Sequence, residues 1–307
     1  MIVCCGEALI DMLPRTTTGN EPAFVPFPGG ALFNSAIALG RLGVPVEFFS
    51  GLSTDLFGRQ LGATLAESGV GTRFVRFSAR PTTLAFVRLD AGQARYEFHD
   101  EGTAGRMLTE HDLPDFGDGV QAMLFGAISL VQEPCGTAYE TLMRREHGRR
   151  VTMLDPNIRP DFIPDGPTHY ARMRRMIAMA DIVKFSHEDL AWFAGSDSPE
   201  AAVAEALRMG PKLVVVTRGG EGAIAYTRNA AVAVKAPKVR VVDTVGAGDT
   251  FNAGLLAALF DIGALDRKSI ARLPEAAIRG ALELACRTAA IAVSRAGANP
   301  PWRNELL

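Results

Sequence analysis

Cysteines are few in this sequence, its charges nearly cancel, and it contains no long apolar run. No pair among the four cysteines has metal-ligand spacing, so we expect reduced core residues in a cytoplasmic protein. The 32 basic and 34 acidic residues leave a net charge of −2, which argues against nucleic acid or an anionic membrane as a partner. No apolar run approaches the ~20 residues of a membrane span, and the apolar N-terminus soon reaches Glu7. We therefore expect neither a membrane helix nor a signal peptide.

Short apolar stretches alternate with helical patterns along most of the 307 residues. The later predicted strands are Ala122–Gly126, Val151–Asp155, Ile182–Phe185 and Leu213–Thr217, and the helices between them lie near 136–148, 168–180, 187–195 and 199–209. This alternation predicts an α/β fold with a doubly wound, mainly parallel sheet flanked by helices. Earlier in the chain, Asp55 is expected to cap a helix that stops at Gly69.

A glycine-rich turn, Gly246-Ala247-Gly248, opens a helix after the apolar stretch Val239–Val242, which we predict as a strand. Small residues let backbone N–H groups approach an anion, and the helix N-terminus adds free donors and a partial positive charge. Asp249 beside this turn would repel an anion unless its carboxylate has a chemical task. We predict that it takes a proton from a hydroxyl that then attacks a bound phosphoryl group. The alternative is an N-capping Asp.

The stretch Asp243–Gly254, which contains this turn, resembles the C-terminal signature of the ribokinase-like (PfkB) carbohydrate kinases. The resemblance covers nearly the whole chain. It implies one ribokinase-like α/β domain over residues 1–307. Into this domain, residues of about 12–28 and 80–104 insert a small β-sheet lid.

The same resemblance assigns roles to the turn. Asp249 would be the catalytic base, and the amides of Gly246, Ala247 and Gly248 would stabilise the transferring phosphoryl group. ATP and Mg²⁺ are the implied cofactors, with K⁺ as a further cation. Family members often bind a monovalent cation between the loop of Asp243 and Thr244 and the terminal loop 296–300.

A second glycine-rich helix start, Gly29-Gly30-Ala31, resembles the N-terminal signature of the family. Asn34 lies one turn further on, and because Asn is a poor helix former we expect it to bond a group outside the helix. Asp11 follows the first apolar strand, where ligands of open α/β sheets lie. The resemblance implies that Asp11, Gly29, Gly30 and Asn34 hold the sugar. A surface carboxylate and a plain glycine turn are the alternatives.

Two extended stretches, Thr83–Leu89 and Ala94–Phe98, are joined at Asp90-Ala91-Gly92, which predicts a hairpin. In the family such strands form the lid, so Phe98 is a candidate to cover the sugar, with ordinary lid packing as the alternative. His99-Asp100 stands where the family often has a Tyr-Arg pair. An exposed lid face could pair two chains edge to edge, which predicts a homodimer.

Polar residues cluster at the ends of the later strands. Asp155-Pro-Asn157-Ile-Arg159 resembles the family's Asp-x-Asn-x-Arg segment, which implies that Asn157 meets a phosphate or metal-bound water and that Arg159 shapes the sugar pocket. Ser186 and Asp189 stand where many members have Asn-x-x-Glu. The resemblance implies that Asp189 contacts Mg²⁺ through water, although Glu188 could take that role. The other residues expected at the nucleotide are Lys184, Ser186, Thr217, Gly219 and Gly222.

The resemblance implies an ATP-dependent kinase for a sugar hydroxyl. The Gly-Gly-Ala form is closer to fructokinases than to ribokinases, so we expect conversion of D-fructose to fructose 6-phosphate. 2-Keto-3-deoxygluconate, ribose or a nucleoside remain alternative acceptors, and a non-catalytic sugar sensor remains an alternative function. Neither a dinucleotide fingerprint after the first strand nor a Walker motif is present, which disfavours an oxidoreductase and a P-loop kinase.

Overall fold

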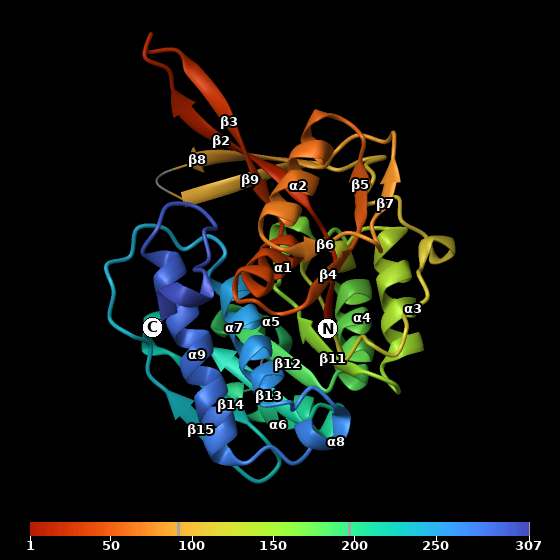
Figure 1. Ribbon diagram of the computed structural model, residues 1–307, viewed down its shortest axis with the longest axis vertical. Helices are drawn as coiled ribbons and strands as arrows, with labels where there is room; N and C mark the ends of the chain where they lie inside the picture. The colour runs from red at the N-terminus through yellow and green to blue at the C-terminus, as the bar shows by residue number, and fades with distance from the viewer. Residues whose placement is uncertain (91–92, 196–197, 307) are drawn as a thin grey trace.

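The computed structural model describes residues 1–90, 93–195 and 198–306, and one large sheet runs through it (Figure 1). Its strands are β1 (Ile2–Cys5), β4 (Val46–Phe49), β6 (Val70–Gly71), β10 (Ala122–Gly126), β11 (Val151–Asp155), β12 (Ile182–Ser186), β13 (Leu213–Thr217), β14 (Ala223–Tyr226) and β15 (Ala231–Val234). Within the described residues their order is β15-β14-β13-β12-β11-β10-β1-β4-β6. Only the pairs β13–β14 and β14–β15 are antiparallel there, so the mainly parallel sheet is confirmed.

Helices cover both faces of this sheet, and strand residues alternate between two hydrophobic cores. In β1, Ile2 and Cys4 belong to one core, whereas Val3 and Cys5 belong to the other. The first core is closed by α1 (Ala31–Arg41), α2 (Leu56–Glu67), α7 (Ala247–Asp261), α8 (Arg267–Ile270) and α9 (Glu275–Val293). The second is closed by α3 (Cys135–Glu146), α4 (Gly166–Met179), α5 (His187–Ala194) and α6 (Pro199–Met209).

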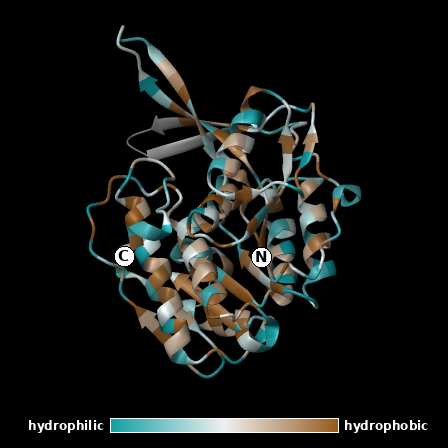
Figure 2. Ribbon diagram, viewed as in Figure 1, coloured by the Kyte–Doolittle hydropathy of each residue, from teal (hydrophilic) through white to brown (hydrophobic). Residues whose placement is uncertain are grey.

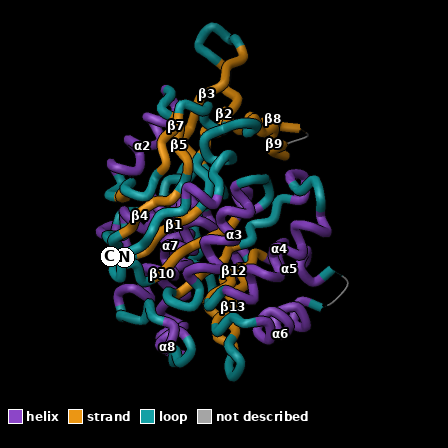
Figure 3. Tube along the Cα trace, turned by 90° about the vertical axis from the view of Figure 1, so that its right-hand side faces the viewer, coloured by secondary structure: helices purple, strands orange, loops and turns teal. Residues whose placement is uncertain are grey.

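The pictures agree with this layering. Figure 3 shows α8 on one side of the sheet and α4, α5 and α6 on the other. The central strands are coloured as hydrophobic in Figure 2, as expected for strands that helices cover on both faces. The four cysteines are buried free thiols. In the part of the chain that the structure describes, no helix has both the length and the apolar character needed to cross a bilayer.

A smaller sheet lies at one end of the molecule. It contains β2 (Leu9–Thr16), β3 (Pro22–Gly29), β8 (Leu84–Asp90) and β9 (Gln93–His99), in the order β3-β2-β8-β9. The hairpin of β2 and β3 projects from the top of the molecule in Figure 1. β8 and β9 pair antiparallel as predicted, but part of the predicted turn Asp90-Ala91-Gly92 lies outside the described residues. A two-stranded sheet of β5 (Gly51–Ser53) and β7 (Arg76–Ser78) completes the described strands.

The predicted strand Val239–Val242 is wrong. This segment is a loop in which Val239, Val241 and Val242 are exposed, and the Val242 amide donates to the Val293 carbonyl at the end of α9. A strand needs a neighbouring strand, and the large sheet already ends at β15. Three valines among four residues express a local preference only, which the surrounding packing overrides here.

Candidate active site

The two glycine-rich helix starts meet in space. α7 begins after Gly246, whose backbone is left-handed at φ 73°, and α1 begins after Gly30, at φ 109°. The Asn34 side-chain amide donates to Asp249 Oδ2 at 2.9 Å. The Ser35 hydroxyl donates to the Asp249 carbonyl at 3.1 Å. Asn34 therefore bonds a group outside its own helix, and it holds the carboxylate that follows the glycine-rich turn.

A cavity of about 980 Å³ opens around this contact, between the small sheet and the carboxyl ends of β11, β12 and β13. Most of the residues that the sequence analysis assigned to the site line it. They are Asp11, Gly30, Asn34, Phe98, Asn157, Arg159, Lys184, Ser186, Asp189, Thr217, Gly219, Thr244, Gly246, Ala247, Gly248 and Asp249. Residues from the first and the last third of the chain thus converge on one space.

Three expected site residues, Gly29, Gly222 and Asp243, do not line this cavity. A Cβ on Gly29 would lie 2.3 Å from Asp11 Oδ2, so this glycine makes room for that carboxylate. Gly222 has a φ of 102° and packs against the Val234 carbonyl, so it serves the turn between β13 and β14. The Asp243 carboxylate accepts from the amides of Val245 at 3.0 Å and Gly297 at 2.9 Å. It joins the two loops between which the sequence analysis placed a cation.

Asp249 is a buried carboxylate whose pKa lies well above the usual value for Asp. Burial raises its pKa to about 7, and the nearby charge of Asp155 adds to this rise. The hydrogen bond from Asn34 and the charges of Lys184 and Arg159 act in the opposite direction. A carboxylate whose pKa lies near neutrality is suited to take up a proton and release it again.

Ser186 and Asp189 form a capping box at the start of α5. The Ser186 hydroxyl accepts from the Asp189 amide, and Asp189 Oδ2 accepts from the Ser186 amide at 2.8 Å. Asp189 Oδ1 accepts from the Ile158 amide at 2.6 Å. Both carboxylate oxygens therefore already have backbone donors, whereas Glu188 on the same turn is exposed and also lines the cavity.

Phe98 and Asp100 come from the small sheet and the loop after it. Phe98 lines the cavity and packs edge-on against Phe162, with ring centroids 4.2 Å apart. Asp100, in place of the family's Arg, forms an ion pair with Arg106 at 2.9 Å.

Three further residues in or beside the cavity were not predicted from the sequence as site residues: Glu7, Asp155 and Asn252. Glu7 lines the cavity, and its Oε1 accepts from the Ala31 amide at 2.8 Å. Burial raises the pKa of Glu7 to about 7. Its position directly after the first buried strand was the available signal. Asp155 and Asn252 lie inside quoted motifs, but their mutual contact depends on two distant segments.

The family model for pfkB family carbohydrate kinases matches residues 1–305. This chain belongs to the pfkB family of carbohydrate kinases. It is 56% identical over 279 residues to a fructokinase from Rhizobium leguminosarum bv. trifolii, covering 91% of this chain and 86% of that relative. The predicted family and its phosphotransferase class are therefore confirmed.

Solved structures are similar over nearly the whole chain. A Xylella fastidiosa fructokinase with bound ATP superposes with a TM-score of 0.91, at 29% identity, covering 99% of this chain and 97% of that one. A Vibrio cholerae O395 fructokinase with fructose, ADP and calcium has a TM-score of 0.83, at 29% identity, over 97% and 94%. The predicted ribokinase-like fold is confirmed by these neighbours.

Proposed function

We propose that this kinase transfers the terminal phosphoryl group of ATP to D-fructose and forms fructose 6-phosphate. The observation that carries the proposal is the buried Asp249 carboxylate, held by Asn34 beside the anion-binding turn of α7. The 56% identical fructokinase and the fructokinase structures with ATP or with fructose and ADP support the choice of substrates.

In this proposal, Asp249 takes the proton of the attacking hydroxyl. A bond forms between that oxygen and the terminal phosphorus, the bond from phosphorus to the bridging oxygen breaks, and ADP leaves with the bond's electrons. The amides of Gly246, Ala247 and Gly248 donate to the phosphoryl oxygens. Phosphoryl transfer depends mainly on positioning and electrostatic stabilisation, which rigidly held amides and one base can supply.

The sugar would lie between Asp11, Gly30, Asn34, Phe98 and Arg159, which line one region of the cavity. Burial raises the pKa of Asp11 to about 6, so its carboxylate gains from sugar hydroxyls that donate to it. Gly29 contributes by leaving room for Asp11. We propose that the small sheet acts as a lid on a single domain and excludes water, because an open site would hydrolyse ATP.

The nucleotide would contact Asn157, Lys184, Ser186, Thr217 and Gly219, which line the cavity at the strand ends. Among the described residues no group of three His, Cys, Asp or Glu side chains could hold a metal by itself. This fits Mg²⁺, which proteins often bind through one or two carboxylates plus substrate phosphates. We assign a water-mediated contact to Asp189, with Glu188 beside it. When bound, Mg²⁺ would neutralise phosphate charge, and K⁺ would lie near Asp243 and Thr244.

We also propose a homodimer formed through the small sheet. Phe24 on the edge strand β3 is 45% exposed, and Phe27 is 40% exposed. Light scattering should give twice the mass of the chain for the wild type and the mass of one chain for Phe24→Asp. A monomeric wild type would reject this proposal. We place the protein in the cytoplasm, because its four buried thiols are unpaired.

The proposed activity is tested by ATP consumption with Mg²⁺ and K⁺ across fructose, ribose, 2-keto-3-deoxygluconate, inosine and adenosine. We expect selective turnover of fructose. Selective turnover of another acceptor would keep the chemistry and reject the substrate. Sugar binding without any ATP turnover would reject the enzyme in favour of a sugar sensor.

A further inference from the structure

A buried ion pair and an amide lie beneath the anion-binding turn. Lys184 Nζ donates to Asp155 Oδ2 at 3.1 Å, and Asn252 Nδ2 donates to the same oxygen at 2.6 Å. The side chains of the ion pair are each 4% exposed. The three residues belong to β12, β11 and α7, so the cluster joins two strand ends to the helix that begins at the turn.

The ammonium of Lys184 lies close to the turn itself. A Cβ built on Gly248 would lie 3.1 Å from Lys184 Nζ, and both residues line the cavity. An ammonium has three N–H donors, and Asp155 uses one of them. Burial opposes the charged form, but the carboxylates of Asp155, Asp189 and Asp249 outweigh it and raise the pKa of Lys184. The side chain is therefore a cation at neutral pH.

We propose that Asp155, Lys184 and Asn252 act as one positioning unit for phosphoryl transfer. Asp155 and Asn252 hold the Lys184 ammonium under the turn, where its remaining donors meet the oxygens of the transferring phosphoryl group. Lys184 would then add a cation to the amide donors of Gly246–Gly248, and Asp155 would position the phosphoryl group only through Lys184. This inference rests on the proposed kinase activity and extends it to Asp155 and Asn252, which do not line the cavity.

The charges of this unit also affect the pKa of the proposed base, Asp249. Asp249 is faced by Asp155 and Lys184 from the sheet, by Arg159 after β11, by Asn34 from α1 and by Glu7 after β1. Asp155 raises the pKa of Asp249, whereas Lys184 lowers it. Removing the two charges one at a time should therefore move the acidic limb of the pH–rate profile in opposite directions.

The test compares Lys184→Met, Asp155→Asn and the double variant, with kcat and KM for ATP measured between pH 5.5 and 9. Losing the ammonium should lower kcat by about 10²-fold, as for one lost oxyanion donor. Asp155→Asn should lower kcat by about 10-fold, because the Lys184 ammonium would be misplaced. The kcat of the double variant should lie within about threefold of that of Lys184→Met, because the effects of substituting residues that act as a unit are not additive.

The pH profile supplies a readout that a merely structural role would not move. We expect the acidic limb to shift to lower pH in Asp155→Asn and to higher pH in Lys184→Met. Asp181→Asn is the matched control, because it removes another buried carboxylate with a cationic partner, Arg267 at 3.1 Å, just before β12. It should destabilise the protein without moving the profile.

Additive losses in the double variant, or unshifted profiles, would overturn the inference. If Lys184→Met does not fold, the profile of Asp155→Asn alone decides. Wild-type turnover of fructose in the same assay tests the proposed function separately. An inactive wild type would reject the function, whereas an active wild type with unmoved variants would reject only the positioning unit.

Discussion

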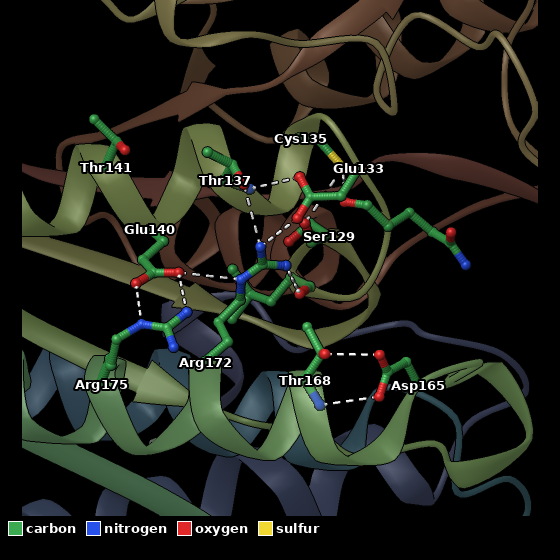
Figure 4. A network of polar contacts seen from close by, with 12 residues as sticks. Ser129, Glu133, Cys135, Thr137, Glu140, Thr141, Asp165, Thr168, Arg172 and Arg175 are labelled. Carbon is green, nitrogen blue, oxygen red and sulfur yellow. Dashed lines mark hydrogen bonds and ion pairs between the residues drawn. The ribbon is translucent and has the colours of Figure 1, made fainter.

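Two buried networks of charged side chains in this molecule shift the pKa values of their carboxylates in opposite directions. Between α3 and α4, Glu140 accepts from Arg172 at 3.2 Å and from Nε and Nη2 of Arg175 at 2.6 and 2.9 Å (Figure 4). Arg172 also donates to Glu133 and to the Leu130 carbonyl. Burial favours the protonated form of Glu140, but these arginines outweigh it and lower its pKa. We call this the α3–α4 network.

The network of the active site is left incomplete. Asp155 Oδ1, Asn252 Oδ1 and Glu7 Oε2 are buried and have no hydrogen-bond partner within the described structure. Burial raises the pKa of Asp249 and Glu7 to about 7. One network therefore saturates its carboxylate with donors, whereas the other leaves buried polar atoms without partners beside the cavity. Such strain is typical of functional sites.

Breaking the α3–α4 network should give the largest effect on stability. Arg172 is 7% exposed on its side chain, and Arg172→Met would leave Glu133 and the Leu130 carbonyl without this donor. Removing one partner of a buried ion pair typically costs about 3–5 kcal/mol. We expect this loss in the free energy of unfolding, measured with urea, and an unchanged kcat per folded molecule. A large fall in kcat would mean that the two networks are coupled.

Removing the Asp249 carboxylate from the active-site network should lower the reaction rate and not the stability. We expect Asp249→Asn to lower kcat at least ~10²-fold, because it removes the proposed general base. Thermal unfolding should occur at the same temperature or higher at pH 8, since a buried carboxylate becomes neutral. Steady-state kinetics and calorimetry on one preparation check both parts. Unchanged turnover would reject Asp249 as the base.

The pH dependence of stability sharpens the contrast. The pKa of Asp249 is raised, so its contribution is present below its unfolded pKa and is lost as pH rises towards about 7. The pKa of Glu140 is lowered, so its contribution is present above its unfolded pKa and is lost as pH falls.

Urea unfolding of wild type, Asp249→Asn and Glu140→Gln between pH 4 and 8 tests these opposite signs. From pH 4 to pH 8, Asp249→Asn should gain at least ~1.4 kcal/mol relative to wild type, the value of one pKa unit. Glu140→Gln should instead lose stability relative to wild type as the pH rises. Parallel curves for both variants would contradict the distinction between the networks.

The smallest effect is expected at the exposed rim of the α3–α4 network. Arg175 has a side chain that is 53% exposed, although it makes two hydrogen bonds to Glu140. Solvent screening limits such a pair to about 0–1 kcal/mol, so Arg175→Ala should shift the urea midpoint only slightly. A loss as large as that of Arg172→Met would show that exposure does not weaken this pair.

Local chemistry explains which parts of the fold could be predicted. Asp55 caps α2 through the Gly58 amide at 2.7 Å, as expected from its residue type and place. β10, β11 and β13 end at the predicted residues, because each is a short and mainly apolar run. The stretch Val239–Val242 carries a similar signal but lacks a neighbouring strand, so the same reasoning failed there.

The sequence by itself determined the glycine-rich turn, the carboxylate beside it and the alternation of strands and helices. These features depend on residue size, backbone freedom and periodicity within a few residues. Only the tertiary structure decided that Asn34 holds Asp249 across 215 positions, that Glu7 caps α1, and that Asp155 shares one oxygen between Lys184 and Asn252. Such contacts depend on how distant elements pack, and that same packing removes the water that would otherwise keep the carboxylate pKa values at their ordinary positions.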